Sequence, residues 1–81
     1  MKYYIIRPLM KPIDENLKNG IFCSDENAEF VNNIKEADIA VLQQGWTVSK
    51  VAVSEYKIAK ENGIPCNEGY LYTDKYEVHT N

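Results

Sequence analysis

The stretch ADIAVLQQGWTVSKVAVSEYKIAKENGIPC, residues 37–66, decides the fold of this 81-residue chain. Its apolar run at residues 39–42 has the length of an interior strand. Ser49 then offers a side-chain oxygen to the free amides of a helix start, and Gly63 suits the left-handed residue after the helix end. Residues 64–66 open another strand. A strand–helix–strand unit of this kind makes its two strands parallel, with a right-handed crossover.

A carboxylate lies on the apolar side of the predicted helix, which runs from Ser49 to about Asn62. At about 100° per residue, Glu55 falls one turn from Val51 and Ala52 on the side that faces the sheet. Burying an unpaired carboxylate costs several kcal/mol. We therefore expect Glu55 to have a partner, a ligand or a wet pocket, the plainer alternative being a salt bridge to a lysine.

The remaining elements are predicted from local signals on either side of this unit. Residues 2–7 are rich in aromatic and β-branched side chains and form a strand that Pro8 ends. Residues 70–72 and 76–78 are strand-like, so residues 67–81 form a hairpin or one edge strand. Between the first strand and the unit we predict a helix that begins at Pro12 and ends before Gly20, a strand at 21–23, and a helix at 25–36 capped by Ser24.

Alternating strands and helices predict one α/β domain over residues 1–81, a small three-layer fold around a parallel sheet of about four strands. The net charge is −3 and no basic cluster is present, which excludes a phosphate-tracking nucleic-acid surface. No apolar run is long enough to span a membrane, and no secretory signal opens the chain, so we expect a cytoplasmic protein. Cys23 and Cys66 lack the spacing of a metal site or redox pair and are expected to be reduced and partly buried. Nothing in the sequence indicates a metal or a cofactor.

Ligands of open parallel sheets bind at the carboxyl ends of the strands. Here that edge is expected to contain Arg7, residues 23–25 and residues 43–49, with Glu55 beneath the last of these. Trp46 offers a surface on which a base or sugar can stack. The sequence therefore predicts a pocket in which Glu55 meets a ribose hydroxyl or an anomeric carbon.

Residues 38–65 resemble the nucleoside 2-deoxyribosyltransferase-like superfamily, and most closely its small bacterial and phage branch. That branch has an Asp before the third strand, a Gly-Trp-x-x-Ser turn, a small-residue step, a Glu-Tyr-x-Ile-Ala segment and a Gly-Ile-Pro segment. Their counterparts here, without gaps, are Asp38, Gly45-Trp46 with Ser49, Ala52, residues 55–59 and residues 63–65.

The resemblance implies a doubly wound, flavodoxin- or Rossmann-like fold and a homo-oligomer. It implies a small nucleoside or nucleotide ligand and a nucleophilic role for Glu55, which would attack the anomeric carbon and form a glycosyl-enzyme intermediate. The residues expected to hold the ligand are Arg7, Pro8, Asp38, Gly45, Trp46, Ser49 and Ala52.

Several positions depart from the family pattern. The family has Gly-Pro after the first strand and Gly-Ala at the small-residue step, where this chain has Arg7-Pro8 and Val51-Ala52. The segment between the first two strands is shorter, and the loop at residues 43–49 carries no further acid that would protonate a leaving base. These departures weigh against turnover more than against binding.

Three functions therefore stay open. The first is an N-glycosidase or deoxyribosyltransferase. The second is a binding module that sequesters a nucleotide signal without cleaving it, such as an ADP-ribose derivative in a phage-infected bacterial cytoplasm. The third is a structural or protein-binding adaptor. Plainer roles also exist for single residues: an N-cap for Ser49, a turn cap for Asp38, a core or interface anchor for Trp46 and a surface ion pair for Arg7.

Overall fold

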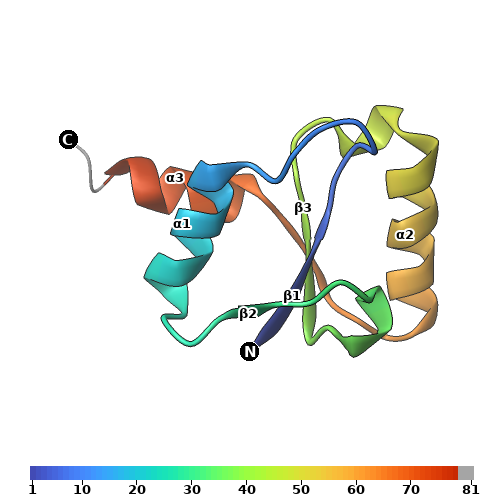
Figure 1. Cartoon of the computed structure of the whole chain (residues 1–81), viewed down its shortest axis with the longest axis horizontal. Helices are drawn as coiled ribbons and strands as arrows, with labels where there is room; N and C mark the ends of the chain where they lie inside the picture. Colours follow the sequence, from blue (N-terminus) through green and yellow to red (C-terminus); the bar gives the residue numbers. More distant parts are fainter. Residues whose placement is uncertain (79–81) are drawn as a thin grey trace.

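A parallel four-stranded sheet forms the middle layer of the molecule, in the order β2-β1-β3-β4. The computed structural model describes residues 1–78, with side chains described through residue 74. The strands are β1 (Lys2–Ile6), β2 (Glu29–Phe30), β3 (Ile39–Leu42) and β4 (Cys66–Glu68). Helix α2 (Lys50–Glu61) covers one face, and α1 (Glu15–Ser24) and α3 (Tyr70–Val78) cover the other (Figure 1). The predicted three-layer α/β fold is confirmed.

The side chains of β1 alternate between the two faces of the sheet, as the pleat requires. Ile6 and the partly buried Tyr4 pack in the core beneath α2. Tyr3 and Ile5 pack on the opposite side, under α1 and α3, where the core consists of Tyr3, Ile5, Leu17, Ile21, Val41 and Tyr72. β1 therefore fixes which residues face which helix layer.

The unit at residues 37–66 forms as its sequence predicts. Ser49 caps α2, with its Oγ accepting a hydrogen bond from the Ala52 amide at 3.3 Å. Gly63 follows the helix with φ of 68°, in the left-handed region. β3 and β4 pair in parallel from Ala40↔Cys66 onward. Between β3 and α2, residues Trp46–Val48 make one turn of 3₁₀ helix.

Between Pro12 and residue 36 a helix forms as predicted but with other bounds, whereas the predicted strand at 21–23 and helix at 25–36 are wrong. α1 begins at Glu15 behind an Asp14 cap and runs through Gly20 and the predicted strand 21–23 to Ser24. In place of a helix at 25–36, the chain forms the two-residue strand β2 and a 3₁₀ turn at Ile34–Glu36. Ser24 therefore ends a helix where we expected it to start one.

Gly20 was expected to end a helix, but it is needed for close contact between two helices. A Cβ atom on Gly20 would lie 2.3 Å from the backbone oxygen of Tyr72 in α3. Gly69, just before α3, is similarly confined: its Cβ would lie 2.7 Å from the oxygen of Leu42. Small residues are required here because the backbones themselves touch.

The tail prediction is wrong as well. Residues 70–78, expected as strands, form α3, and Tyr72 packs edge-on against Tyr3 with ring centroids 6.5 Å apart. This burial of Tyr72 outweighs the strand preference of the tyrosines. Residues 79–81, which the predicted hairpin included, lie outside the described residues.

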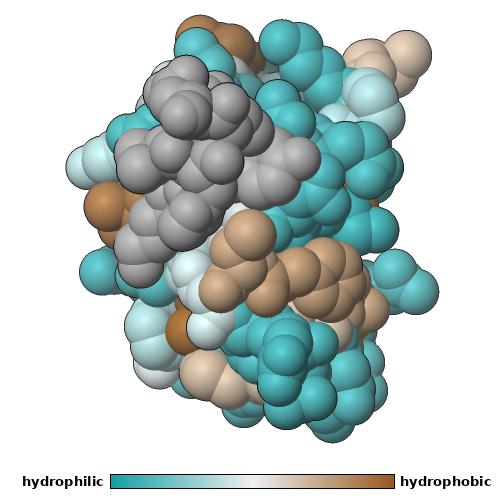
Figure 2. All heavy atoms as spheres, turned by 90° about the vertical axis from the view of Figure 1, so that its left-hand side faces the viewer, coloured by the Kyte–Doolittle hydropathy of each residue, from teal (hydrophilic) through white to brown (hydrophobic). Residues whose placement is uncertain are grey.

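Apolar side chains are exposed on both outer layers. Where it is coloured by hydropathy, the side of the molecule that bears α1 and α3 is mostly hydrophilic, with a small hydrophobic group near the middle of the view (Figure 2). Phe22 and Leu71 are exposed on those helices, and Cys23, expected to be partly buried, is exposed beside them. The expected homo-oligomer stays a prediction. No helix within residues 1–78 is long and apolar enough to cross a membrane.

The contact between α1 and α3 yields a stability prediction. Alanine is about 1 kcal/mol better than glycine inside a helix, yet we expect Gly20→Ala to lower the free energy of unfolding by about 1–3 kcal/mol through overpacking. Asn19→Ala, at an exposed position of the same helix, is the control and should be neutral or slightly stabilising. Urea unfolding of both variants measures the difference. A Gly20→Ala protein as stable as the parent would contradict the contact.

Candidate functional site

A cavity of about 240 Å³ opens at the carboxyl ends of β1 and β2, against the first half of α2. Its polar lining comes from Tyr4, Arg7, Asn32 and Glu55. The remaining wall is largely apolar, with Phe30, Val51, Leu9 and Ile13 among its side chains. Its position agrees with the edge at which parallel sheets bind ligands.

Glu55 enters this cavity half-buried and hydrogen-bonded. The Tyr4 hydroxyl donates to Oε2 of Glu55. Tyr4 faces α2 because alternate residues of β1 do, and Glu55 stands in the second turn of α2 above it. Burial and the Glu55 carboxylate raise the pKa of Tyr4 to about 12, so the phenol stays protonated and remains a donor at neutral pH.

Arg7 supplies the opposite charge. Its Nε atom is buried and, among the described residues, has no hydrogen-bond partner. Nor does any described carboxylate lie within ion-pair distance of its guanidinium, since the one ion pair found there joins the Met1 amine to Asp25. Arg7 is nevertheless close enough to Tyr4 to oppose the rise of its pKa. A cation and a carboxylate thus line one small cavity without neutralising each other.

Four of the expected ligand residues lie outside this cavity: Gly45, Trp46 and Ser49 in the turn that leads into α2, and Pro8 beside that turn. Trp46 packs on Tyr56, with ring centroids 4.9 Å apart and planes at 42°, and belongs to the core. Gly45 has φ of 92°, and a Cβ there would meet Pro8 at 3.5 Å. Ser49 is the helix cap. The plainer roles considered for Trp46 and Ser49 are therefore the ones observed.

Two further expected ligand residues lie elsewhere. Ala52 is fully buried in the core under α2. Asp38 precedes β3, at the amino end of the sheet, where its carboxylate accepts from the Lys2 amide at 2.8 Å. It ties the starts of two strands together and lies far from the carboxyl-end cavity.

Residues 23–25, expected at the same edge as Glu55, lie at the amino end of the sheet instead. Asp25 accepts from the Met1 amino group at 2.9 Å and from the Tyr3 hydroxyl at 3.2 Å. The bond to the amino group lowers the pKa of Asp25. The misplacement follows from the wrong element types before residue 36.

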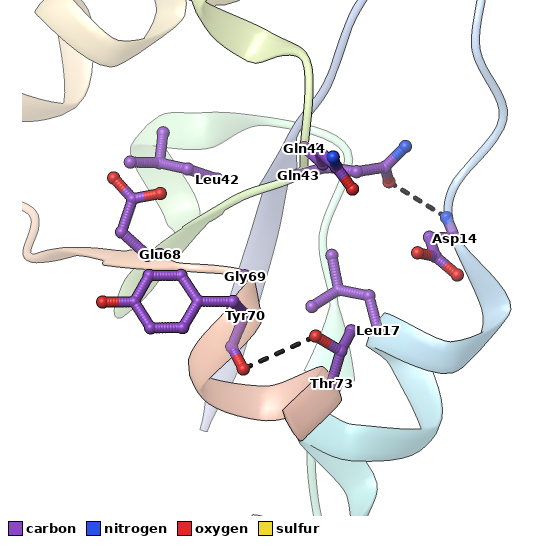
Figure 3. Close-up of a pocket in the computed structure, with 9 residues that line it drawn as sticks. All are labelled: Asp14, Leu17, Leu42, Gln43, Gln44, Glu68, Gly69, Tyr70 and Thr73. Carbon is purple, nitrogen blue, oxygen red and sulfur yellow. Dashed lines mark hydrogen bonds between the residues drawn. The ribbon is translucent and has the colours of Figure 1, made fainter. Parts of the chain in front are cut away.

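A larger cavity of about 360 Å³ lies on the other side of the sheet, beyond the ends of β3 and β4 (Figure 3). Two of its polar side chains, Gln43 and Asp14, hold the fold through hydrogen bonds. Gln43, only 7% exposed, accepts from the Asp14 amide at 2.9 Å and donates to the Pro12 carbonyl at 3.0 Å. Asp14 caps α1 through the Asn16 amide. We place the candidate site at Glu55, because the smaller cavity contains a half-buried carboxylate and a buried guanidinium nitrogen that has no partner among the described residues.

Tyr4, Ile5 and Asn32 are among the cavity residues that the sequence did not predict at the site, as are Ile13, Phe30 and Val31 of the apolar wall. Strand alternation alone places Tyr4 on the same face as Ile6, so the signal for Tyr4 was present. Asn32 needed the true position of β2, which the sequence did not reveal. Within residues 1–78, no group of three His, Cys, Asp or Glu side chains is arranged to hold a metal ion.

Comparison with protein-family models, with curated proteins and with solved structures finds no match to this chain. The functional assignment therefore depends on the chemistry of the cavity and on the motif resemblance.

The Tyr4–Glu55 contact predicts a pH effect. Because the pKa of Tyr4 is about 12 in the folded protein and about 10 in an unfolded chain, the phenol stabilises the fold below pH 10. That stabilisation is lost as the pH rises from about 10 through 12. We expect Tyr4→Phe to lose less stability than the parent over this range, measured by urea unfolding at stepped pH.

Tyr3 provides the matched control, because burial and Asp25 also raise its pKa to about 12. In ultraviolet titrations, Glu55→Gln should lower the pKa of Tyr4 and leave that of Tyr3 in place. The Tyr3→Phe and Tyr4→Phe variants show which titration step belongs to which tyrosine. An unchanged Tyr4 titration in Glu55→Gln would mean that the two side chains are not bonded in solution.

Proposed function

We propose that the Glu55 cavity binds a nucleoside- or nucleotide-derived molecule, with the carboxylate facing its ribose. The observation that carries this proposal is the half-buried Glu55 held by the Tyr4 hydroxyl, in a cavity that also contains the unpaired Nε of Arg7. A ribose offers hydroxyls to a carboxylate, and a phosphate offers oxygens to a guanidinium. The resemblance of residues 38–65 to nucleoside 2-deoxyribosyltransferase-like proteins also implies that Glu55 contacts the sugar of the ligand.

The catalytic form of the proposal is nucleophilic substitution at the anomeric carbon. A Glu55 oxygen forms a bond to that carbon, the glycosidic C–N bond breaks, and the base leaves with the bonding electron pair and takes up a proton. Water or a second base then displaces the carboxylate. Tyr4 would orient the attacking carboxylate and hold its second oxygen away from the sugar.

The cavity also favours a second candidate, binding without cleavage. Carboxylate-based glycoside cleavage ordinarily uses a second acid to protonate the leaving group. Among the described residues that line the cavity, Glu55 is the one carboxylate. A protein that retains the pocket without that acid would sequester its ligand, as expected for a phage protein that captures a nucleotide signal of its host.

Replacement of Glu55 tests both forms. The parent and Glu55→Gln are incubated with nucleosides, 5′-nucleotides and ADP-ribose derivatives, and free base is measured by chromatography. If the protein is an enzyme, we expect release to fall by about 10⁶-fold in the variant, as for loss of a nucleophile. If it only binds, the ligand is recovered intact and calorimetry shows an affinity about 10- to 100-fold weaker in the variant, as for loss of a charged hydrogen bond.

Glu68→Gln is the control, because Glu68 is an exposed carboxylate that lines the larger cavity on the other side of the sheet. It should behave as the parent in both assays. The proposal is refuted if the parent neither releases base from any compound of the panel nor binds any of them. It is also refuted if Glu55→Gln and Glu68→Gln have equal effects.

Arg7 yields a separate prediction about the charge of the ligand. Arg7→Gln keeps a side chain that can donate a hydrogen bond but removes the cation. We expect it to weaken binding of a 5′-nucleotide about tenfold or more while leaving the matching nucleoside within about twofold. Calorimetry of both ligands at two salt concentrations measures this. Equal losses for nucleotide and nucleoside would show that Arg7 does not bind the phosphate.

A further inference from the structure

The edge of β1 that faces β2 is left open in its second half. β2 pairs with β1 at Lys2↔Glu29 and Tyr3↔Phe30 and goes no further. The last hydrogen bond on this side runs from the Val31 amide to the Tyr3 carbonyl, at 2.9 Å. Beyond that point the chain turns away from β1, and the cavity that contains Glu55 begins.

The backbone groups of Ile5 point toward this open edge. In a parallel strand, the amide and carbonyl of one residue face the same neighbour, and the next residue faces the other. The carbonyls of Lys2 and Ile6 accept from the β3 side, at Asp38 and Gln43. By alternation, Ile5 faces the β2 side, together with Tyr3.

No described residue hydrogen-bonds to the Ile5 amide or carbonyl on that side. Ile5 is only 7% exposed, and its side chain packs in the opposite core, yet the residue lines the cavity. What it presents there is therefore its backbone. Backbone groups that the protein leaves unpaired bond to water or to a ligand, so this donor and this acceptor are available to a molecule that enters the cavity.

The size of the cavity decides what kind of partner fits. Pockets for drug-sized ligands span about 300–1,000 Å³, and this one holds about 240 Å³. That volume suits a ring system better than an added peptide strand. A nucleobase carries a hydrogen-bond donor and an acceptor side by side on its edge, which matches the pair offered by one strand residue.

We infer that the open edge of β1 at Ile5 is a nucleobase-binding site, in which the Ile5 amide donates to the base and the Ile5 carbonyl accepts from it. This inference rests on the proposed function and specifies which part of the ligand the backbone holds. Arg7 follows two residues later, about 7 Å further along the strand direction. Base and phosphate would thus be bound at neighbouring points of one edge.

An amide-to-ester exchange at Ile5 tests the inference, because it removes the N–H and keeps the side chain. A synthetic segment of residues 1–22 carrying the ester is joined to residues 23–81 at Cys23, which is exposed. The control is the same exchange at Tyr3. Each ester weakens one carbonyl of the β1–β3 pairing, but only the Ile5 ester removes a donor from the cavity.

The probes are the four common ribonucleoside 5′-monophosphates and ribose 5-phosphate, measured by calorimetry. We expect the Ile5 ester to weaken the tightest of the nucleotides about three- to tenfold, the effect of one hydrogen bond, and to leave ribose 5-phosphate unchanged. The Tyr3 ester should lower the melting temperature and leave nucleotide affinity unchanged.

The inference fails if the Ile5 ester binds nucleotides as tightly as the parent, or if ribose 5-phosphate binds the parent as tightly as any nucleotide. In both cases the proposed function survives. It also fails if sedimentation shows a dimer that the Ile5 ester abolishes, since a second copy would then occupy the edge. If neither nucleotide nor ribose 5-phosphate binds the parent, the proposed function itself is refuted, and the inference with it.

Discussion

The parallel pairing of β1 with β3 is the constraint on which the rest of the structure depends. Its register, from Tyr3↔Ile39 to Ile6↔Leu42, sends Tyr4 toward α2 and Tyr3 toward α1 and α3. A slip of one residue would exchange the two faces of β1. Tyr4 would then leave Glu55, and Tyr3 would leave the core that holds Tyr72. Core packing and the candidate site therefore share one determinant, and a substitution that shifts the register would disturb both.

The unit at residues 37–66 could be predicted because its signals are local. A short apolar strand, a serine cap and a glycine after the helix each act within a few residues. The same locality explains why Glu55 was found, since helix periodicity alone places it on the inner face. The strand at 21–23, the helix at 25–36 and the tail were mispredicted because the structure of these residues depends on distant contacts. From its neighbours in sequence, Gly20 is predicted to end a helix. It lies inside α1 because the backbone of Tyr72, 52 positions later in the chain, leaves no room for a side chain there.

The candidate site shows the same division. Of the expected residues, Arg7 and Glu55 line the cavity. Both positions could be predicted from local signals, since Arg7 follows the end of a strand and Glu55 lies on the inner face of a helix. The loop residues Gly45 and Trp46 belong to the turn and the core, since their sequence pattern is equally suited to both uses. Asp38 was included because of its motif, although a residue that precedes a strand lies at the amino end of a parallel sheet, away from the edge that binds ligands. Its contact with the Lys2 amide is at the far end.

The part of the site that no local pattern revealed is also the part that gives it room. Because β2 stops after two residues, β1 keeps an unpaired edge directly beside Glu55 and Arg7. A longer β2 would stabilise the sheet by completing the ladder, but it would fill the cavity and bury both charges against backbone. The short strand thus leaves the sheet less stable but keeps a concave surface open. That surface contains a hydrogen-bond donor and acceptor from the Ile5 backbone, the cation of Arg7 and the anion of Glu55. We propose that such a surface suits a molecule that combines a base, a sugar and a phosphate better than it suits an apolar partner.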